Sequence, residues 1–161
     1  MNNTIEFNTE GLIAYYPLNG NADDGSGNER NGQLINSPTF TEDRFGIPNQ
    51  AITFNGSTNY VSIPYYNLGN EPVTISCWVK ATTYANNYWG IISLYDDNTK
   101  VEYRIAQYGN SFVISRNNPG YNWYITSAYP ITLNTWYNVT LRYSSSLLEM
   151  YVDGSFFTSI T

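Results

Sequence analysis

The stretch WYNVTLRY, residues 136–143, decides the fold of this chain. Tyr137, Val139, Leu141 and Tyr143 alternate with the polar residues between them. Successive side chains of a β-strand point to opposite faces of a sheet. The pattern therefore predicts a strand with one face in a core and the other in water.

Segments with the same period of two fill most of the chain, and turns rich in Gly, Asn, Asp and Pro separate them. No segment shows the spacing of an amphipathic helix. The predicted strands are residues 12–16, 33–35, 50–54, 59–63, 73–80, 90–95, 101–108, 111–116, 122–128, 136–143, 148–152 and 156–160. So many short strands predict an all-β fold of two packed antiparallel sheets.

Composition excludes several classes of function. The chain has 161 residues, which fits a single domain over 1–161. It carries 7 basic and 13 acidic residues, for a net charge of −6, so we expect no nucleic-acid partner. The absence of His excludes His-dependent catalysis and His-ligated zinc. No apolar run has the length of a membrane helix, so we expect no membrane insertion.

One predicted strand, residues 73–80, contains the single cysteine, Cys77. Alternation places Cys77 with Val73, Ile75 and Val79 on the apolar face, where it acts as a small buried hydrophobe. Trp78 then lies on the polar face of the same strand. An aromatic ring on a polar face is a candidate contact for a ligand.

The loop NGNADDGSGNERNG, residues 19–32, combines oxygen donors with backbone freedom. Two carboxylates at Asp23 and Asp24, a third at Glu29 and four asparagines are interleaved with four glycines. Calcium is bound by such carboxylate, amide and carbonyl oxygens. The same residue types also form ordinary surface turns, so the loop alone leaves both interpretations open.

Five short segments, in this order, resemble the laminin-G-like domains of the concanavalin A-like lectin/glucanase superfamily. They are GLIAYYPLNGNA with DGSGN and NG at residues 11–32, FNG with YV at 54–61, TISCWVK at 74–80, WYNVT at 136–140 and YVDG at 151–154. The resemblance implies a jelly-roll sandwich with one flatter and one concave sheet. In many members it also implies a calcium ion near the opening loop.

Carried over residue by residue, the resemblance places the calcium ligand on Asp24, which matches the acidic position of the family's Asp-x-Ser-Gly pattern. Asn21, Asn28 and Asn31 are then candidate amide or carbonyl donors. Asp23 is an additional carboxylate beside the pattern. Calcium would stabilise the folded loop by binding to it.

Catalysis is not expected. Retaining glucanases of this superfamily carry Glu-x-Asp-x-x-Glu on one strand, so that two carboxylates share a face, and this chain lacks that triplet. Glu102 stands alone among apolar neighbours, and Asp153 belongs to a hairpin turn.

We expect a noncatalytic, lectin-like module that binds a glycan or polysaccharide. Flat rings stack on the apolar faces of sugars, while amides and carboxylates bind the hydroxyls. The candidate sugar-binding residues are Trp78, Tyr88, Trp89, Asp96, Tyr121 and Trp123. The alternative is an adhesion module of a cell-surface or phage-type protein, whose aromatic residues contact another protein.

Laminin-G-like domains usually continue past the YVDG hairpin with further strands. We therefore expect this chain to be a fragment of a longer domain, or to complete its sheet with a partner chain or a second copy of itself. The alternative is a compact variant of the domain, in which residues 156–160 themselves close the sheet. A secreted or cell-surface location is expected, with the signal not present in this chain.

Overall fold

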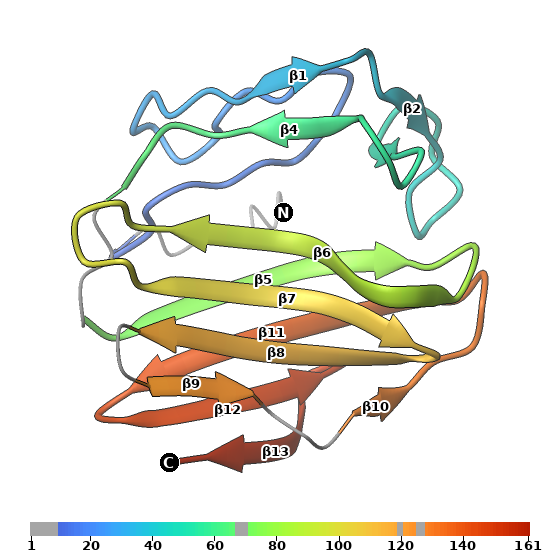
Figure 1. Ribbon diagram of the computed structural model, residues 1–161. Helices are drawn as coiled ribbons and strands as arrows, with labels where there is room; N and C mark the ends of the chain where they lie inside the picture. The colour runs from blue at the N-terminus through green and yellow to red at the C-terminus, as the bar shows by residue number, and fades with distance from the viewer. Residues whose placement is uncertain (1–9, 67–70, 119–120, 125–127) are drawn as a thin grey trace, which may run out of the picture. The chain divides into compact units, whose positions relative to one another are not determined.

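The computed structural model describes residues 10–66, 71–118, 121–124 and 128–161, with the backbone alone at residues 118 and 121–124. The described residues form thirteen strands and no helix. None of them therefore forms a helix that could cross a membrane. The contacts divide the chain into two compact units, Met1–Tyr65 and Tyr66–Thr161. Figure 1 shows the strands of each unit.

The first unit contains two small antiparallel sheets. β1 (Gln33–Ile35) pairs with β4 (Tyr60–Ser62), and β2 (Thr39–Thr41) pairs with β3 (Ala51–Thr53). Sequence reasoning did not predict β2. The polar loop of residues 19–32 precedes β1 in the chain.

The strand predicted at residues 12–16 is wrong, because this segment has no strand partner in the described structure. Its backbone bonds to the polar loop instead. The Tyr15 amide donates to Asp24 Oδ1 (2.9 Å), and the Tyr15 carbonyl accepts from the Gly25 amide (2.7 Å). The Asn28 side-chain amide donates to the carbonyls of Leu12 (2.8 Å) and Ile13 (3.1 Å). The loop thus takes the groups that a sheet would use.

The second unit is a sandwich of two antiparallel sheets. The four-stranded sheet has the order β13-β12-β11-β5, and the five-stranded sheet has the order β10-β8-β7-β6 with β9 beside β8. The first sheet contains β5 (Val73–Lys80), β11 (Trp136–Ser144), β12 (Leu147–Val152) and β13 (Ser155–Ile160). The second contains β6 (Ala85–Tyr95), β7 (Glu102–Gly109), β8 (Ser111–Asn118), β9 (Tyr121–Tyr124) and β10 (Tyr129–Pro130). The predicted all-β sandwich is confirmed.

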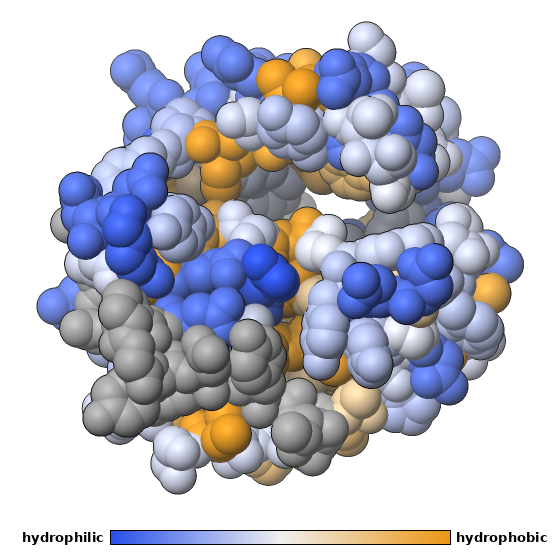
Figure 2. Space-filling view, viewed as in Figure 1, coloured by the Kyte–Doolittle hydropathy of each residue, from blue (hydrophilic) through white to orange (hydrophobic). Residues whose placement is uncertain are grey.

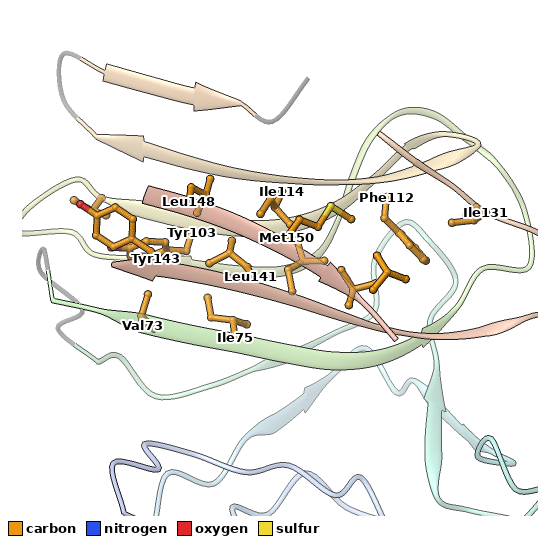
Figure 3. Close-up of a cluster of buried hydrophobic side chains, with 14 of the residues drawn as sticks. Val73, Ile75, Tyr103, Phe112, Ile114, Ile131, Leu141, Tyr143, Leu148 and Met150 are labelled. Atoms are coloured by element: carbon orange, nitrogen blue, oxygen red, sulfur yellow. The ribbon is translucent and has the colours of Figure 1, made fainter. Parts of the chain in front are cut away.

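The core of the second unit lies between its two sheets. The labelled side chains in Figure 3 point toward one another from both layers. The four-stranded sheet supplies Val73, Ile75, Val139, Leu141, Leu148 and Met150, and the five-stranded sheet supplies Tyr103, Ile105, Phe112 and Ile114. In β11 the buried residues are those that period two predicts. The opposite face of β5 and β11 is therefore turned to solvent.

Two other differences from the predicted strands stand out. β6 begins at Ala85, five residues before the predicted start, and it contains register shifts at Ala85/Trp89 and Gly90/Ile92. These irregularities interrupt the period-two pattern on which the prediction relied. The predicted strand at 122–128 corresponds to β9, and its residues 125–127 lie outside the described structure.

Candidate functional site

A solvent-exposed pocket lies on the outer face of the four-stranded sheet. Trp78, Trp136, Asn138, Asp153 and Gly154 line it, and its volume is about 610 Å³. Trp78 lies opposite Asn138 in the pairing of β5 with β11. Asp153 and Gly154 form the turn between β12 and β13. Three neighbouring parts of one sheet therefore meet at the pocket.

The hairpin turn is held against β11 by two hydrogen bonds. The Asp153 amide donates to the Asn138 carbonyl (2.9 Å), and the Asn138 amide donates to Asp153 Oδ1 (2.8 Å). Asp153 and Gly154 both have positive φ values, 49° and 76°. Asp and Gly tolerate this left-handed conformation better than most residues. The sequence Asp-Gly thus places one carboxylate at the edge of the pocket.

Two hydroxyl groups next to the pocket hold the Asn138 side chain in a hydrogen-bond network. Asn138 Nδ2 donates to Ser76 Oγ (3.1 Å), and Thr140 Oγ1 donates to Asn138 Oδ1 (3.3 Å). The hydroxyls of Ser76 and Thr140 lie 2.8 Å apart. These bonds fix the orientation of the Asn138 amide.

Two indole rings form the apolar side. Trp78 is 45% exposed, so its predicted position on the outer face is confirmed. The Lys80 ammonium lies 5.0 Å from the centre of the Trp136 ring, within the range of a cation–π contact. Cys77 points the other way and packs against the core, where burial raises the pKa of its thiol to about 12.

The remaining predicted sugar-binding residues do not join this pocket. Tyr88 and Trp89 lie on β6 of the five-stranded sheet, where Tyr88 stacks on Tyr108 with ring centres 4.3 Å apart. Tyr121 and Trp123 lie on β9 of the same sheet, and their side chains lie outside the described residues. The aromatic candidates are thus divided between the two sheets.

Asp96 is fully buried, with 0% exposure. Its Oδ1 accepts hydrogen bonds from the amides of Asn98 (2.8 Å) and Thr99 (3.2 Å) and shapes the turn between β6 and β7. A buried carboxylate presents no surface to a glycan. This position counts against the predicted sugar contact.

Glu102 has partners that sequence reasoning did not identify. Its carboxylate accepts hydrogen bonds from Ser93, Arg104 and Asn117. Burial acts to raise the pKa of Glu102, but these bonds outweigh it, and the pKa lies below its usual value. Hydrophilic side chains gather on the outer face of the five-stranded sheet, which is the face turned to the viewer in Figure 2. A carboxylate held ionised in this way is a poor proton donor.

Asp24 lies at the centre of the polar loop. Its Oδ1 accepts from the amides of Tyr15 and Ser26 (both 2.9 Å), and its Oδ2 accepts from Ser26 Oγ (2.8 Å) and the Arg30 amide (3.1 Å). Partial burial acts to raise its pKa, but the four bonds prevail and lower the pKa to about 2. A carboxylate has about four lone-pair sites. Asp24 in this arrangement therefore does not fit the role of a calcium ligand.

The other predicted calcium ligands also bond within the loop. Asn31 Oδ1 accepts from the Asp24 amide (2.9 Å), and Asn28 donates to the carbonyls of the opening segment. Asn21 Nδ2 donates to Asp23 Oδ2 (2.7 Å), and Asn21 Oδ1 accepts from the Asp23 amide (3.1 Å). Within the described ranges, no group of three Asp, Glu, His or Cys side chains is placed to hold a metal ion. That search does not include the amide and carbonyl oxygens that also bind calcium. Calcium binding stays a prediction from the family resemblance.

Sequence reasoning missed four of the five pocket residues as parts of a site, namely Trp136, Asn138, Asp153 and Gly154. The signal was present in part, because period two places Trp136 and Asn138 on the polar face of one strand. Their proximity to Trp78 depends on the register between β5 and β11, which lie more than fifty residues apart in the chain.

Two solved structures resemble this fold. Domain 4 of AbnA, a GH43 extracellular arabinanase from Geobacillus stearothermophilus, in complex with arabinotriose, has a TM-score of 0.67 and 16% identity; the match covers 91% of this chain and 73% of that one. A Trp-to-Ala mutant of HCR D/C VPI 5995 has a TM-score of 0.66 and 15% identity, with 92% and 38% covered. At these identities the likeness shows the fold alone.

Comparison with curated protein sequences finds no significant match. A family model does match residues 55–161, which is most of the chain. The matched range includes both strands that bring the indole rings to the pocket. The chain therefore belongs to the Laminin_G_3 family of the concanavalin A-like lectin/glucanases superfamily.

Proposed function

We propose that the protein is a noncatalytic carbohydrate-binding module and that the pocket of Trp78, Trp136, Asn138 and Asp153 is its site. The observation that carries the proposal is the meeting of two indole rings with an oriented amide and a carboxylate in an open pocket. Indole faces stack on the C–H faces of sugar rings. The amide and the carboxylate are suited to bind the hydroxyl groups at the edge of the ring.

The carboxylates of the second unit support a noncatalytic role. Glycoside hydrolysis needs one carboxylic acid with a raised pKa beside a second carboxylate. Glu102 has a lowered pKa, and Glu149 pairs with Arg142 at 2.8 Å. Asp153 bonds to a backbone amide in a hairpin turn. None of these three provides the acid.

The related fold of an arabinanase domain bound to arabinotriose supports the choice of ligand class to be tested first. We would screen a glycan array and then a panel of arabino-, xylo-, cello- and malto-oligosaccharides of one to four units. Each binding assay would be run with added calcium and with chelator, so that a calcium requirement for binding is detected. A secreted or cell-surface location agrees with extracellular glycans as partners and forms part of the same proposal.

The decisive variants are Trp78→Ala and Trp136→Ala, with Tyr88→Ala as the matched control on the other sheet. We expect both tryptophan variants to lose binding and Tyr88→Ala to keep it. The comparison requires that the circular-dichroism spectra of all three variants show a folded protein. If Tyr88→Ala loses binding and Trp78→Ala keeps it, the site lies on the five-stranded sheet instead. If no glycan binds the wild type, the proposed function is wrong.

A protein-adhesion module is the second candidate, and one loop of the first unit favours it. Asp43 Oδ1 accepts hydrogen bonds from the amides of Phe45 (2.8 Å) and Ile47 (2.9 Å). The loop is thus held in one conformation while Phe45 is 70% exposed. Aromatic residues, Phe among them, are enriched in the cores of protein interfaces. Absence of glycan binding, together with capture of a protein that Phe45→Ala abolishes, would establish this alternative.

A further inference from the structure

The outer face of the four-stranded sheet continues past the pocket as a second row of side chains. Thr140 lies opposite Ser76 on one side and Tyr151 on the other, and Tyr151 lies opposite Phe156. These four residues alternate with core residues along their strands, which places them all on the outer face. The row crosses the whole sheet from β5 to β13.

Two aromatic rings close the far end of this row. The rings of Tyr151 and Phe156 meet edge to face, with centres 5.7 Å apart and planes 75° apart. The Tyr151 hydroxyl donates to Glu149 Oε1 (3.2 Å), which anchors the Tyr151 ring. Phe156 is 57% exposed. A large apolar ring with this exposure, supported by a second ring, resembles a contact surface more than a packing residue.

The order of side chains across the sheet is aromatic, polar and aromatic. Trp78 lies opposite Asn138 in one row, and Ser76, Thr140, Tyr151 and Phe156 form the next row. A diagonal from Trp78 on β5 to Phe156 on β13 therefore passes the Asn138 amide and the Thr140 hydroxyl between its two aromatic ends. Three inter-strand steps separate β5 from β13, or roughly 14 Å. That length accommodates three sugar rings placed end to end.

The charged side chains of this face balance one another. Arg142 pairs with Glu149, Lys80 lies over Trp136, and Asp153 bonds to the Asn138 amide. Two cations thus stand with two carboxylates, in a chain whose net charge is −6. This face offers no excess positive charge for an acidic polysaccharide.

We propose that this face binds a linear, neutral oligosaccharide across the strands, with Tyr151 and Phe156 forming a second subsite beyond the tryptophan pocket. The inference rests on the proposed function and extends it. The bound segment contains about three sugar units. The first unit stacks on the indoles, the middle unit bonds to the amide and hydroxyl groups, and the third stacks on Phe156.

The test is a chain-length series, measured by isothermal titration calorimetry with the panel of one to four units. Affinity should rise up to three units and then level off. Phe156→Ala should weaken trisaccharide binding about five- to tenfold and leave monosaccharide binding unchanged. Trp78→Ala should weaken binding at every length. Phe54→Ala, which removes an exposed phenylalanine of the first unit, is the matched control and should change neither.

The outcomes separate the subsite from the proposed function. If monosaccharide and trisaccharide bind equally well and Trp78→Ala abolishes both, the pocket binds sugar and the second subsite does not exist. An equal effect of Phe156→Ala at all lengths, or no effect at any length, also overturns the subsite. If no member of the panel binds, both the proposed function and the proposed subsite are wrong.

Discussion

Asp24 links the opening segment of the first unit to the polar loop of residues 19–32. Its two oxygens accept hydrogen bonds from Tyr15 on one side and from Ser26 and Arg30 on the other. Each of these donors would otherwise need water or another partner. One carboxylate therefore joins the opening segment to the loop that follows it.

Two explanations of this loop make different predictions about calcium. The family resemblance predicts that calcium raises the melting temperature of the wild type and not that of Asp24→Ala. The hydrogen bonds predict that Asp24→Ala is less stable even in chelator, by about 1–3 kcal/mol, because four donors lose their acceptor. Melting curves of both proteins, with calcium and with chelator, measure both effects. Equal melting of the wild type in calcium and in chelator would contradict the calcium site.

The lowered pKa of Asp24 predicts a pH dependence. The folded-state pKa is about 2, against an ordinary value of 3.8, so the folded state favours the ionised form. The stabilisation is present above the ordinary pKa of 3.8 and is lost as the pH falls through the folded-state pKa of about 2. Urea unfolding of wild type and Asp24→Asn between those values should show a stability difference that shrinks with acidification. A difference that stays constant with pH would rule out this role.

Cys77 should be chemically inert in the folded protein. Burial raises the pKa of its thiol to about 12, and the thiolate is the reactive form. A thiol reagent should label Cys77 only at the rate of unfolding, and faster in urea. Rapid labelling of the native protein would mean that the orientation of β5 is inverted, with Trp78 in the core.

At the scale of elements, the period of two predicted which face of a strand is buried but not where the strand pairs. It placed Trp78 on the polar face of β5 and Asn138 on the polar face of β11, as the structure has them. It could not predict that these residues lie opposite each other, because register depends on distant side chains and turns. It failed at residues 12–16, where side chains of a loop replace a neighbouring strand.

The hairpin turn between β12 and β13 should depend on the Asp153 oxygen. Asp153→Ala removes the acceptor of the Asn138 amide and places Ala at a φ of 49°. We expect a loss of about 1–3 kcal/mol. Asp153→Asn keeps an acceptor oxygen and a residue that tolerates this φ, so it should lose much less. Urea unfolding of the two variants gives the comparison, and equal losses would show that the hydrogen bond does not hold the turn.

At the scale of the whole molecule, alternation and turn composition were sufficient for the fold class, since the sandwich follows from many short strands with one apolar face. The site was harder to predict from the sequence than the fold class. Trp78 was identified from its face, whereas Tyr88 and Trp89 were grouped with it although they lie on the other sheet. Aromatic residues near turns are common to both sheets, and only the three-dimensional arrangement separates them. The family match at residues 55–161 crosses the division between the two compact units, so the prediction of a single domain over 1–161 stays open to test.

The net charge of the whole chain makes a last prediction, which concerns the kind of polysaccharide bound. With 13 acidic and 7 basic residues, the protein repels polyanions at long range. Salt screens this repulsion, since the Debye length falls from about 30 Å at 0.01 M to about 3 Å at 1 M. Retention on a neutral polysaccharide should therefore be nearly independent of salt, and any retention on an acidic one, such as polygalacturonate, should increase with salt. Strong binding to polygalacturonate at low salt that is lost as salt is added would contradict this prediction. Basic side chains such as Lys80 would then bind the carboxylates of the polysaccharide, and the ligand would be an acidic glycan.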